Sequence, residues 1–221
     1  MIISQCMTNT TCHFLDMHSP VVNGIQYLIN NPNDIIEGTL LRGQQWNSLI
    51  IDVIKKYIKD KHLTHFLNVG SHIGSVGLPI SLCINKVTCI EAYPDTYQHL
   101  IQNITLNQIS NVTTHNVALG NSTESVFFMG IDTICPQEKK NRIKNNSGGM
   151  HVFTKDDIKQ NRRSAACCDE LKQNQMVRLD DLNVDPFDIM LVDIEGSEHA
   201  FLLGAVNKIK QHKPIIIIEL W

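Results

Sequence analysis

The chain has 221 residues, 43% of them hydrophobic, so it can bury one sizeable core, and we expect a single domain over residues 1–221. A net charge of −3 and a pI near 6.3 exclude a global basic field that would recruit nucleic acid. No apolar run reaches the roughly 20 residues of a membrane span, and the N-terminal residues lack a signal-peptide pattern. The seven cysteines, an odd number, are expected to be free thiols in a cytoplasmic protein.

Residues 1–60 are predicted to form an N-terminal extension followed by a helix. Within them, Leu49–Ile58 places apolar residues at helical spacing with charged residues between, and Ser48 is the expected N-cap. We expect this helix to pack on a sheet just before the first strand.

The next stretch predicts a strand, a tight turn and a helix. His65–Val69 is an apolar run too short for a helix, and an apolar, helix-compatible segment continues to Leu82 after a run of small residues. Glycines in the turn let the backbone pass close to a ligand, and the N–H groups that open the helix can hold an anion.

A second predicted strand, Lys86–Ile90, ends at an acid, Glu91, which lies 21 positions after Gly70. About 20 positions separate a nucleotide-binding glycine turn from the carboxylate that holds the ribose hydroxyls, so these elements predict a nucleoside-cofactor site. A nicotinamide enzyme would show Gly-x-Gly-x-x-Gly, but His72 replaces its second glycine and leaves Gly70-x-x-x-Gly74. This spacing favours a smaller group than a pyrophosphate, such as the amino-acid end of S-adenosylmethionine.

A helix over residues 96–107 and a strand over 112–119 continue the alternation, which predicts an α/β fold with a parallel sheet and right-handed crossovers. Residues 121–176 interrupt it, as either a solvated excursion or a lid over the substrate.

The alternation then returns with three more predicted elements. Residues 187–193 form an apolar strand, a helix runs through Ala205 to about Gln211, and a last strand covers residues 215–219. Three predicted strands end in acids: Glu91, Asp193 and Glu219. Since open parallel sheets bind ligands at this edge, three acids beside a glycine turn indicate a site.

Five blocks occur in an order that resembles the FkbM family of S-adenosylmethionine-dependent methyltransferases, over roughly residues 35–219. They are Asn68–Gly74, Glu91–Pro94, Asn116–Gly120, Leu179–Leu182 and Val192–Glu198. The resemblance implies a class I methyltransferase (Rossmann-like) fold, a three-layer sandwich with a mostly parallel sheet. It also implies O-methylation, often of sugar or natural-product hydroxyls.

On this resemblance, the glycine turn lines the methionine end of the cofactor, Glu91 holds the ribose, and residues 116–118 border the adenine. The cofactor-binding residues it implies are Asn68, Gly70, Ser71, His72, Gly74, Glu91, Ala92, Asn116, Ala118 and Asp193. The chain departs from the family pattern, which usually has Asp at Asn68 and Asn at His72. Family members also continue past the last strand into a hairpin, so the fold is expected to be shortened at the C-terminus. Its strand Ile215–Ile218 would then be covered by residues 121–176 or by another chain in a homo-oligomer.

Methyl transfer to a hydroxyl requires alignment and removal of the hydroxyl proton. Asp193, Glu195, His199 and His72 are the candidates to take this proton, although Glu195 and Glu198 also suit the first turn of a helix. Two carboxylates at neighbouring strand ends, Asp193 and Glu219, could hold Mg²⁺. The competing account is free of metal, with Asp193 or Glu195 as the base.

We therefore predict an S-adenosylmethionine-dependent O-methyltransferase that acts on a hydroxyl of a saccharide or small metabolite. The alternative is a non-catalytic module that binds S-adenosylmethionine or a partner, motivated by Asn68 and the C-terminus. An RNA ribose methyltransferase would need lysines around the site and a basic track. The acids at the strand ends have no lysine beside them, so we expect no nucleic-acid partner.

Overall fold

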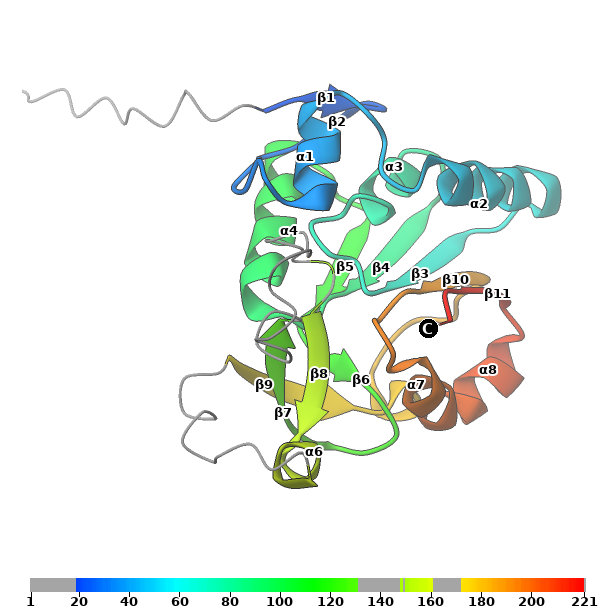
Figure 1. The fold of residues 1–221 in the computed structure, drawn as a ribbon. Helices are drawn as coiled ribbons and strands as arrows, with labels where there is room; N and C mark the ends of the chain where they lie inside the picture. The colour runs from blue at the N-terminus through cyan, green and yellow to red at the C-terminus, as the bar shows by residue number, and fades with distance from the viewer. Residues whose placement is uncertain (1–18, 131–147, 149, 161–171, 221) are drawn as a thin grey trace, which may run out of the picture.

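The computed structural model describes residues 19–130, 148, 150–160 and 172–220. Its centre is a five-stranded sheet whose neighbouring strands are all parallel (Figure 1). The strands lie in the order β11 (Ile215–Ile218), β10 (Ile189–Val192), β3 (His65–Val69), β4 (Lys86–Ile90) and β5 (Val112–His115). The chain builds outward from β3 to β5 and then returns to the other side of β3. This confirms the predicted parallel sheet and puts its switch point between β3 and β10.

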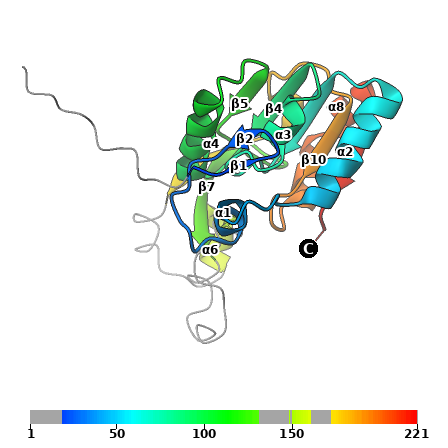
Figure 2. The ribbon, with the colours of Figure 1, turned by 90° about the horizontal axis from the view of Figure 1, so that it is seen from above.

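Helices cover both faces of this sheet, because successive side chains of a strand point to opposite sides. One apolar cluster, which includes Phe66 and Val87, packs beneath four helices: α1 (Ile35–Leu41), α2 (Ser48–Lys61), α3 (Gly77–Ser81) and α4 (Pro94–Leu106). The other, which includes Leu67 and Met190, packs against three elements: the 3₁₀ turn Leu179–Asp181, α7 (Glu198–Gly204) and α8 (Val206–His212). Figure 2 views the first layer from above, with the sheet beneath it. The predicted three-layer sandwich is confirmed.

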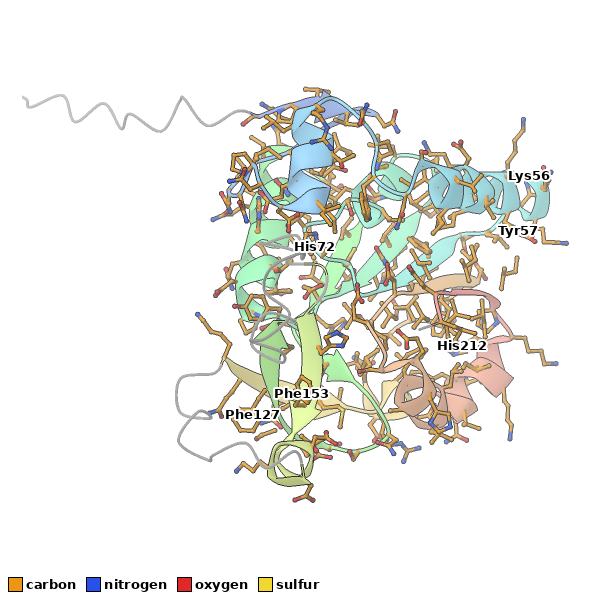
Figure 3. The ribbon with its side chains drawn as sticks, in the orientation of Figure 1. Lys56, Tyr57, His72, Phe127, Phe153 and His212 are labelled. Atoms are coloured by element: carbon orange, nitrogen blue, oxygen red, sulfur yellow. The ribbon has the colours of Figure 1, made fainter. Side chains whose placement is uncertain are left out.

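The predicted amphipathic helix is present as α2. Its buried side chains recur at helical spacing: Ile51, Ile54 and Ile58. Lys56 and Tyr57 lie on its outer side (Figure 3). The predicted N-cap is wrong by one residue, since Asn47 precedes the helix and Ser48 is its first member. Asn47 has a φ of 50°, a left-handed conformation that asparagine tolerates better than most residues.

The described part of the predicted N-terminal extension belongs to the main core. A short hairpin, β1 (Val21–Val22) and β2 (Ile25–Gln26), leads into α1. Ile25 and Tyr27 are fully buried in the same apolar cluster as the central strands.

Two asparagines of α4 tie this N-terminal segment to the rest of the domain. Asn107 accepts from the Gln26 N–H at 2.8 Å and donates to the Gln26 carbonyl at 2.7 Å. Asn103 accepts from the Leu28 N–H at 2.9 Å and donates to the carbonyl of Ile73 at 3.0 Å. Since Ile73 lies in the glycine turn, Asn103 links the N-terminal segment directly to that turn.

The described strands between residues 118 and 177 differ most from the prediction, because they form a second sheet. Its strands lie in the order β6 (Ala118–Leu119), β9 (Gln173–Val177), β7 (Glu124–Gly130) and β8 (Met150–Thr154), and α6 (Lys155–Gln160) follows β8. The predicted strand over 112–119 therefore splits, with β5 in the central sheet and β6 in the second. Asn116 lies at the break and donates to the carbonyl of Glu91 at 2.8 Å. Phe127 and Phe153 face each other across the β7 and β8 pair (Figure 3).

The helix predicted through Ala205 to about Gln211 is also divided. Ala205 ends α7 and precedes α8, with φ −118° and ψ 4°, values outside the helical range. The preceding residue, Gly204, packs directly on the chain after β6, because a Cβ there would lie 1.8 Å from the Gly120 carbonyl oxygen. The chain thus turns where it meets the second sheet.

The last strand, β11, pairs with β10 alone among the described strands and forms the edge of the central sheet. Ile216 is 37% exposed there. The described strands of residues 121–176 make their own sheet and do not cover this edge. Association with another chain through β11 stays a prediction. Over the described residues, no helix combines the length and apolar character needed to cross a bilayer.

Candidate functional site

A cavity of about 530 Å³ lies at the carboxyl ends of the central strands, a size suited to a small molecule or cofactor. Four lining residues directly follow central strands: Gly70, Glu91, Asp193 and Glu219. Five others come from the second sheet: Ala118, Leu119, Phe128, His151 and Val152. The N-terminal segment, between the start of α1 and the start of α2, adds four more: Ile35, Ile36, Trp46 and Asn47. The cavity therefore joins the central sheet, the second sheet and the N-terminal segment.

The glycine turn is held against both neighbouring strands. The N–H groups of Gly70 and Ser71 both donate to the carbonyl of Ile90 at 3.0 Å. Gly70 has a φ of 82°, and a Cβ there would lie 1.7 Å from the carbonyl oxygen of Asp193. Only glycine fits this position, because any side chain would separate the ends of β3 and β10.

Glu91 is fixed by backbone donors. Its Oε2 accepts from the His72 N–H and its Oε1 from the Tyr93 N–H, each at 2.8 Å. Burial raises the pKa of Glu91 to about 7, although these two bonds favour the charged form. A carboxylate offers about four lone-pair sites, so it can also accept from hydroxyl donors in the cavity.

His72 lies in the turn and lines the cavity, between the central sheet and the N-terminal segment (Figure 3). Its φ of 49° is left-handed, which is uncommon for a residue other than glycine. Burial lowers the pKa of His72 to about 4, and the negative charge of Asp34 opposes this only in part. The imidazole is therefore neutral at neutral pH.

Asp193 and Glu219 meet at the ends of adjacent strands, as the parallel register of β10 and β11 requires. Their carboxyl groups lie close enough for the charge of Glu219 to act on the titration of Asp193. Burial, with the negative charge of Glu219, raises the pKa of Asp193 to about 6. The pair therefore retains a proton more strongly than two separate acids would.

Glu195 brings a third carboxyl to this end of the cavity. Burial, then the charges of Asp193 and Glu219, raises the pKa of Glu195 to about 7. Its φ of 53° and the φ of 92° at Gly196 form a left-handed turn. The buried Glu198 stabilises this turn by accepting from the Gly196 N–H at 3.0 Å. Glu198 therefore has a structural role in this turn, in addition to any favourable interaction with the helix dipole.

His151 is a cavity residue that the sequence analysis did not identify. It lies on β8, and its Nδ1 is 2.8 Å from the carbonyl oxygen of Glu195. This contact joins the second sheet to the acidic end of the cavity. No signal in the sequence distinguishes His151, because it lies in the segment that interrupts the strand and helix alternation.

The lining has an acidic character. It contains four acids: Glu91, Asp193, Glu195 and Glu219. No lysine or arginine lines it within the described part of the chain. Carboxylates favour cationic and hydroxyl-bearing ligands over phosphorylated ones.

A model of the FkbM methyltransferase domain matches residues 68–220. The chain belongs to the FkbM methyltransferase family. These are S-adenosylmethionine-dependent methyltransferases, and the parallel sheet with helices on both faces is their class I, Rossmann-like fold. The match begins at Asn68, just before the glycine turn, and includes every acid that lines the cavity. No curated protein matches the sequence.

Several solved structures resemble this FkbM chain. The methyltransferase FkbM from Methylobacillus flagellatus KT is 20% identical, with a TM-score of 0.44, over 70% of this chain and 32% of that one. Precorrin-6y C5,15-methyltransferase from Geobacter metallireducens GS-15 is 12% identical, with a TM-score of 0.39, over 77% and 61%. TYW2 from M. jannaschii, in complex with AdoMet, is 19% identical, with a TM-score of 0.30, over 42% and 40%. This chain spans about a third of the length of the M. flagellatus protein.

Most of the residues that the FkbM resemblance implies for the cofactor line the cavity: Gly70, Ser71, His72, Glu91, Ala92, Ala118 and Asp193. Three others do not line it: Asn68, Gly74 and Asn116. Asn68 is buried beneath the turn, and neither polar atom of its side chain has a hydrogen-bond partner among the described residues. Gly74 lets Leu78 pack close, since a Cβ there would lie 2.6 Å from its Cγ.

The candidate proton acceptors fall into two groups. Asp193, Glu195 and His72 line the cavity. His199 is exposed on α7 and does not line it, because the helix turns this side chain toward solvent. Among the described residues, no three His, Cys, Asp or Glu side chains are grouped to hold a metal ion. A Mg²⁺ site at Asp193 and Glu219 stays a prediction.

Proposed function

We propose that this FkbM protein transfers the methyl group of S-adenosylmethionine to a hydroxyl of an uncharged saccharide or other small metabolite. The observation that carries the proposal is the anchored Glu91 carboxylate beside the glycine turn. Two backbone N–H groups hold it, and its remaining lone pairs suit the two hydroxyls of a ribose.

The shape and charge of the cavity support this donor. Gly70 brings backbone without a side chain to the cavity wall, and Asp193 is a carboxylate partner for the ammonium group of the methionine end. The cavity volume of about 530 Å³ suits a nucleoside with an amino-acid tail and leaves room at the acidic end.

The same lining supports an uncharged acceptor. Repulsion from Asp193, Glu195 and Glu219 disfavours a phosphorylated or sulfated acceptor, and the described lining has no lysine or arginine to offset it. A hydroxyl, by contrast, can donate to any of these oxygens.

S-adenosylmethionine supplies a methyl group that is already activated on a sulfonium, so the protein must align the reactants and remove a proton. The central sheet holds the donor, through Gly70 and Glu91. The walls from the second sheet exclude water from the acceptor end, with Phe128 and Val152 as apolar contacts. A carboxylate or an imidazole at this end of the cavity takes the hydroxyl proton.

The proposal is tested with the full chain and methyl-labelled S-adenosylmethionine. The acceptors are a panel of methyl glycosides and polyols, their phosphorylated counterparts and primary amines. We expect S-adenosylhomocysteine to form and the label to appear on oxygen of an uncharged compound. Label only on nitrogen or on phosphorylated compounds would contradict the proposal, as would calorimetry that detects no donor binding.

The alternative of a non-catalytic binding module was motivated by Asn68. Asn68 lies beneath the turn and outside the cavity lining, so its missing charge removes no group from that lining. Tight donor binding without S-adenosylhomocysteine from any compound of the panel would favour this alternative.

A further inference from the structure

We propose that His151 is the general base of the reaction, and that its Nε2 takes the proton of the acceptor hydroxyl. The inference rests on the proposed methyl transfer and assigns a residue to its proton step. It arises from the second sheet, which brings His151 on β8 to the acidic end of the cavity.

The contact between His151 and Glu195 fixes the form of the imidazole. Nδ1 lies 2.8 Å from the backbone carbonyl oxygen of Glu195, and a carbonyl oxygen can only accept. Nδ1 therefore carries the hydrogen, and Nε2 of the neutral ring carries the free lone pair. Within the described part of the chain, Nε2 has no hydrogen-bond partner, so its lone pair is available in the cavity.

The surroundings of His151 are rich in acids. The titratable groups that share the cavity with it are Glu91, Tyr93, Asp193, Glu195, Glu219 and His72. Four of these carry carboxyl groups, and His72 is neutral at neutral pH. The Glu195 carbonyl continues to accept from Nδ1 after Nε2 is protonated.

The position of Glu195 suggests a second role for its unusual backbone. The left-handed turn at Glu195 and Gly196, held by Glu198, aims the Glu195 carbonyl at the second sheet. Left-handed backbone in a residue other than glycine persists only where its surroundings enforce it. Glu195 is thus a positioning residue for His151 through its backbone, whatever its side chain does.

The proposed step balances as an in-line displacement. The hydroxyl oxygen uses a lone pair to bond to the methyl carbon, and the carbon–sulfur bond breaks. Its electron pair stays on sulfur, which gives S-adenosylhomocysteine. The hydroxyl proton passes to Nε2 of His151, and the imidazolium later releases it to solvent.

His151→Asn separates the base from the structural contact, because the asparagine amide can replace Nδ1–H as donor to Glu195 but has no basic nitrogen. With the best acceptor of the methyl glycoside panel, we expect kcat to fall by about 10²–10⁴. Calorimetry should give an affinity for S-adenosylmethionine within about twofold of the wild type, since His151 holds no donor group. His199→Asn is the matched control, with an exposed histidine of the neighbouring helix, and should keep full activity.

A pH profile distinguishes a base from a packing residue. The wild-type kcat should fall on the acid side as Nε2 becomes protonated, and His151→Asn should lose that limb. If His151→Asn keeps its rate within about threefold, or Glu195→Gln alone removes the limb, the inference is overturned.

A second readout needs no acceptor. Long-range ¹H–¹⁵N NMR of the full chain, with the His151→Asn spectrum for assignment, should show His151 protonated at Nδ1 and not at Nε2 at pH 8. The opposite tautomer would overturn the inference, even in an active enzyme. Wild-type protein that fails to bind S-adenosylmethionine would instead refute the proposed function, whatever tautomer NMR reports.

Discussion

Replacing Glu91 by alanine should weaken the binding of S-adenosylmethionine, because we propose this anchored carboxylate as the partner of the ribose. The His72 and Tyr93 N–H groups occupy one site on each of its oxygens. A carboxylate has about four lone-pair sites, so it can still accept from the ribose hydroxyls. The side chain is therefore already oriented before the donor arrives, and binding does not have to order it.

The magnitude follows from the kind of bond that is lost. A hydrogen bond to a charged group contributes about 1.5–3 kcal/mol. Loss of this partner should raise Kd by roughly ten- to a hundredfold. The loss should appear in Kd for the donor, measured by calorimetry on the wild type and on Glu91→Ala.

The pH dependence gives a second, independent signature. Since burial raises the pKa of Glu91 to about 7, about a tenth of these carboxyls are charged at pH 6 and about nine tenths at pH 8. Donor binding needs the charged form, so affinity should rise roughly ninefold between these pH values and level off above them. Glu91→Ala should lose this rise.

Asp60→Ala is the control, because Asp60 is an exposed carboxylate on α2 that pairs only with Lys56 among the described residues. It should leave both the affinity and its pH dependence unchanged. Unchanged affinity in a folded Glu91→Ala protein would refute the ribose assignment. A rise with pH that persists in Glu91→Ala would assign the titration to other acids, Asp193 or Glu195.

Three further predictions concern the turn, the acid pair and the sheet edge. Gly70→Ala should lower the free energy of unfolding by about 2–5 kcal/mol in denaturant titrations and abolish donor binding, since its Cβ would overlap the Asp193 carbonyl. Gly43→Ala is the control, because Gly43 has a φ of 73° and open space around it. It should lower the free energy of unfolding by only about 1–2 kcal/mol. Activity should survive exhaustive EDTA treatment and be lost in Asp193→Asn, and loss on chelation that Mg²⁺ restores would instead favour the metal account. Light scattering should show self-association, and replacing Ile216 on the edge strand by a charged residue should remove it. A monomer at all concentrations would contradict this prediction.

The cofactor half of the site could be predicted from the sequence because its signals are local. β3 and β4 have the predicted limits, and Gly70 and Glu91 follow them directly. A parallel sheet then brings strand ends to one edge, so Asp193 and Glu219 meet without any knowledge of their partners. Here the pattern of strand and turn is enough, since each strand is a short buried run and each turn contains residues that only a turn needs.

The second sheet could not be predicted as a whole. The apolar run Val126–Met129 predicts a short strand, which is present within β7, but nothing local indicates the distant strands with which it pairs. β9 pairs with β6 and β7, far away in the chain, and opens with three polar residues, Gln173, Asn174 and Gln175. Asn174 has a structural use: its side chain donates to the carbonyl of Ala92 at 2.7 Å and that of Asn116 at 3.2 Å. Asn174, a residue type typical of loops, thus ties the second sheet to the segments that follow β4 and β5.

The contrast between local sequence signals and long-range strand pairing explains why the acceptor is harder to infer than the donor. The proposed donor contacts are Gly70, Glu91 and Asp193, which lie within the matched FkbM domain and follow the central strands. The acceptor end is completed by Phe128, His151 and Val152, whose places depend on long-range strand pairing rather than on a motif. If His151 takes the proton there, the second sheet carries chemistry as well as shape. Membership of the family then predicts the donor, whereas the acceptor depends on the particular residues that β7 and β8 present to the cavity.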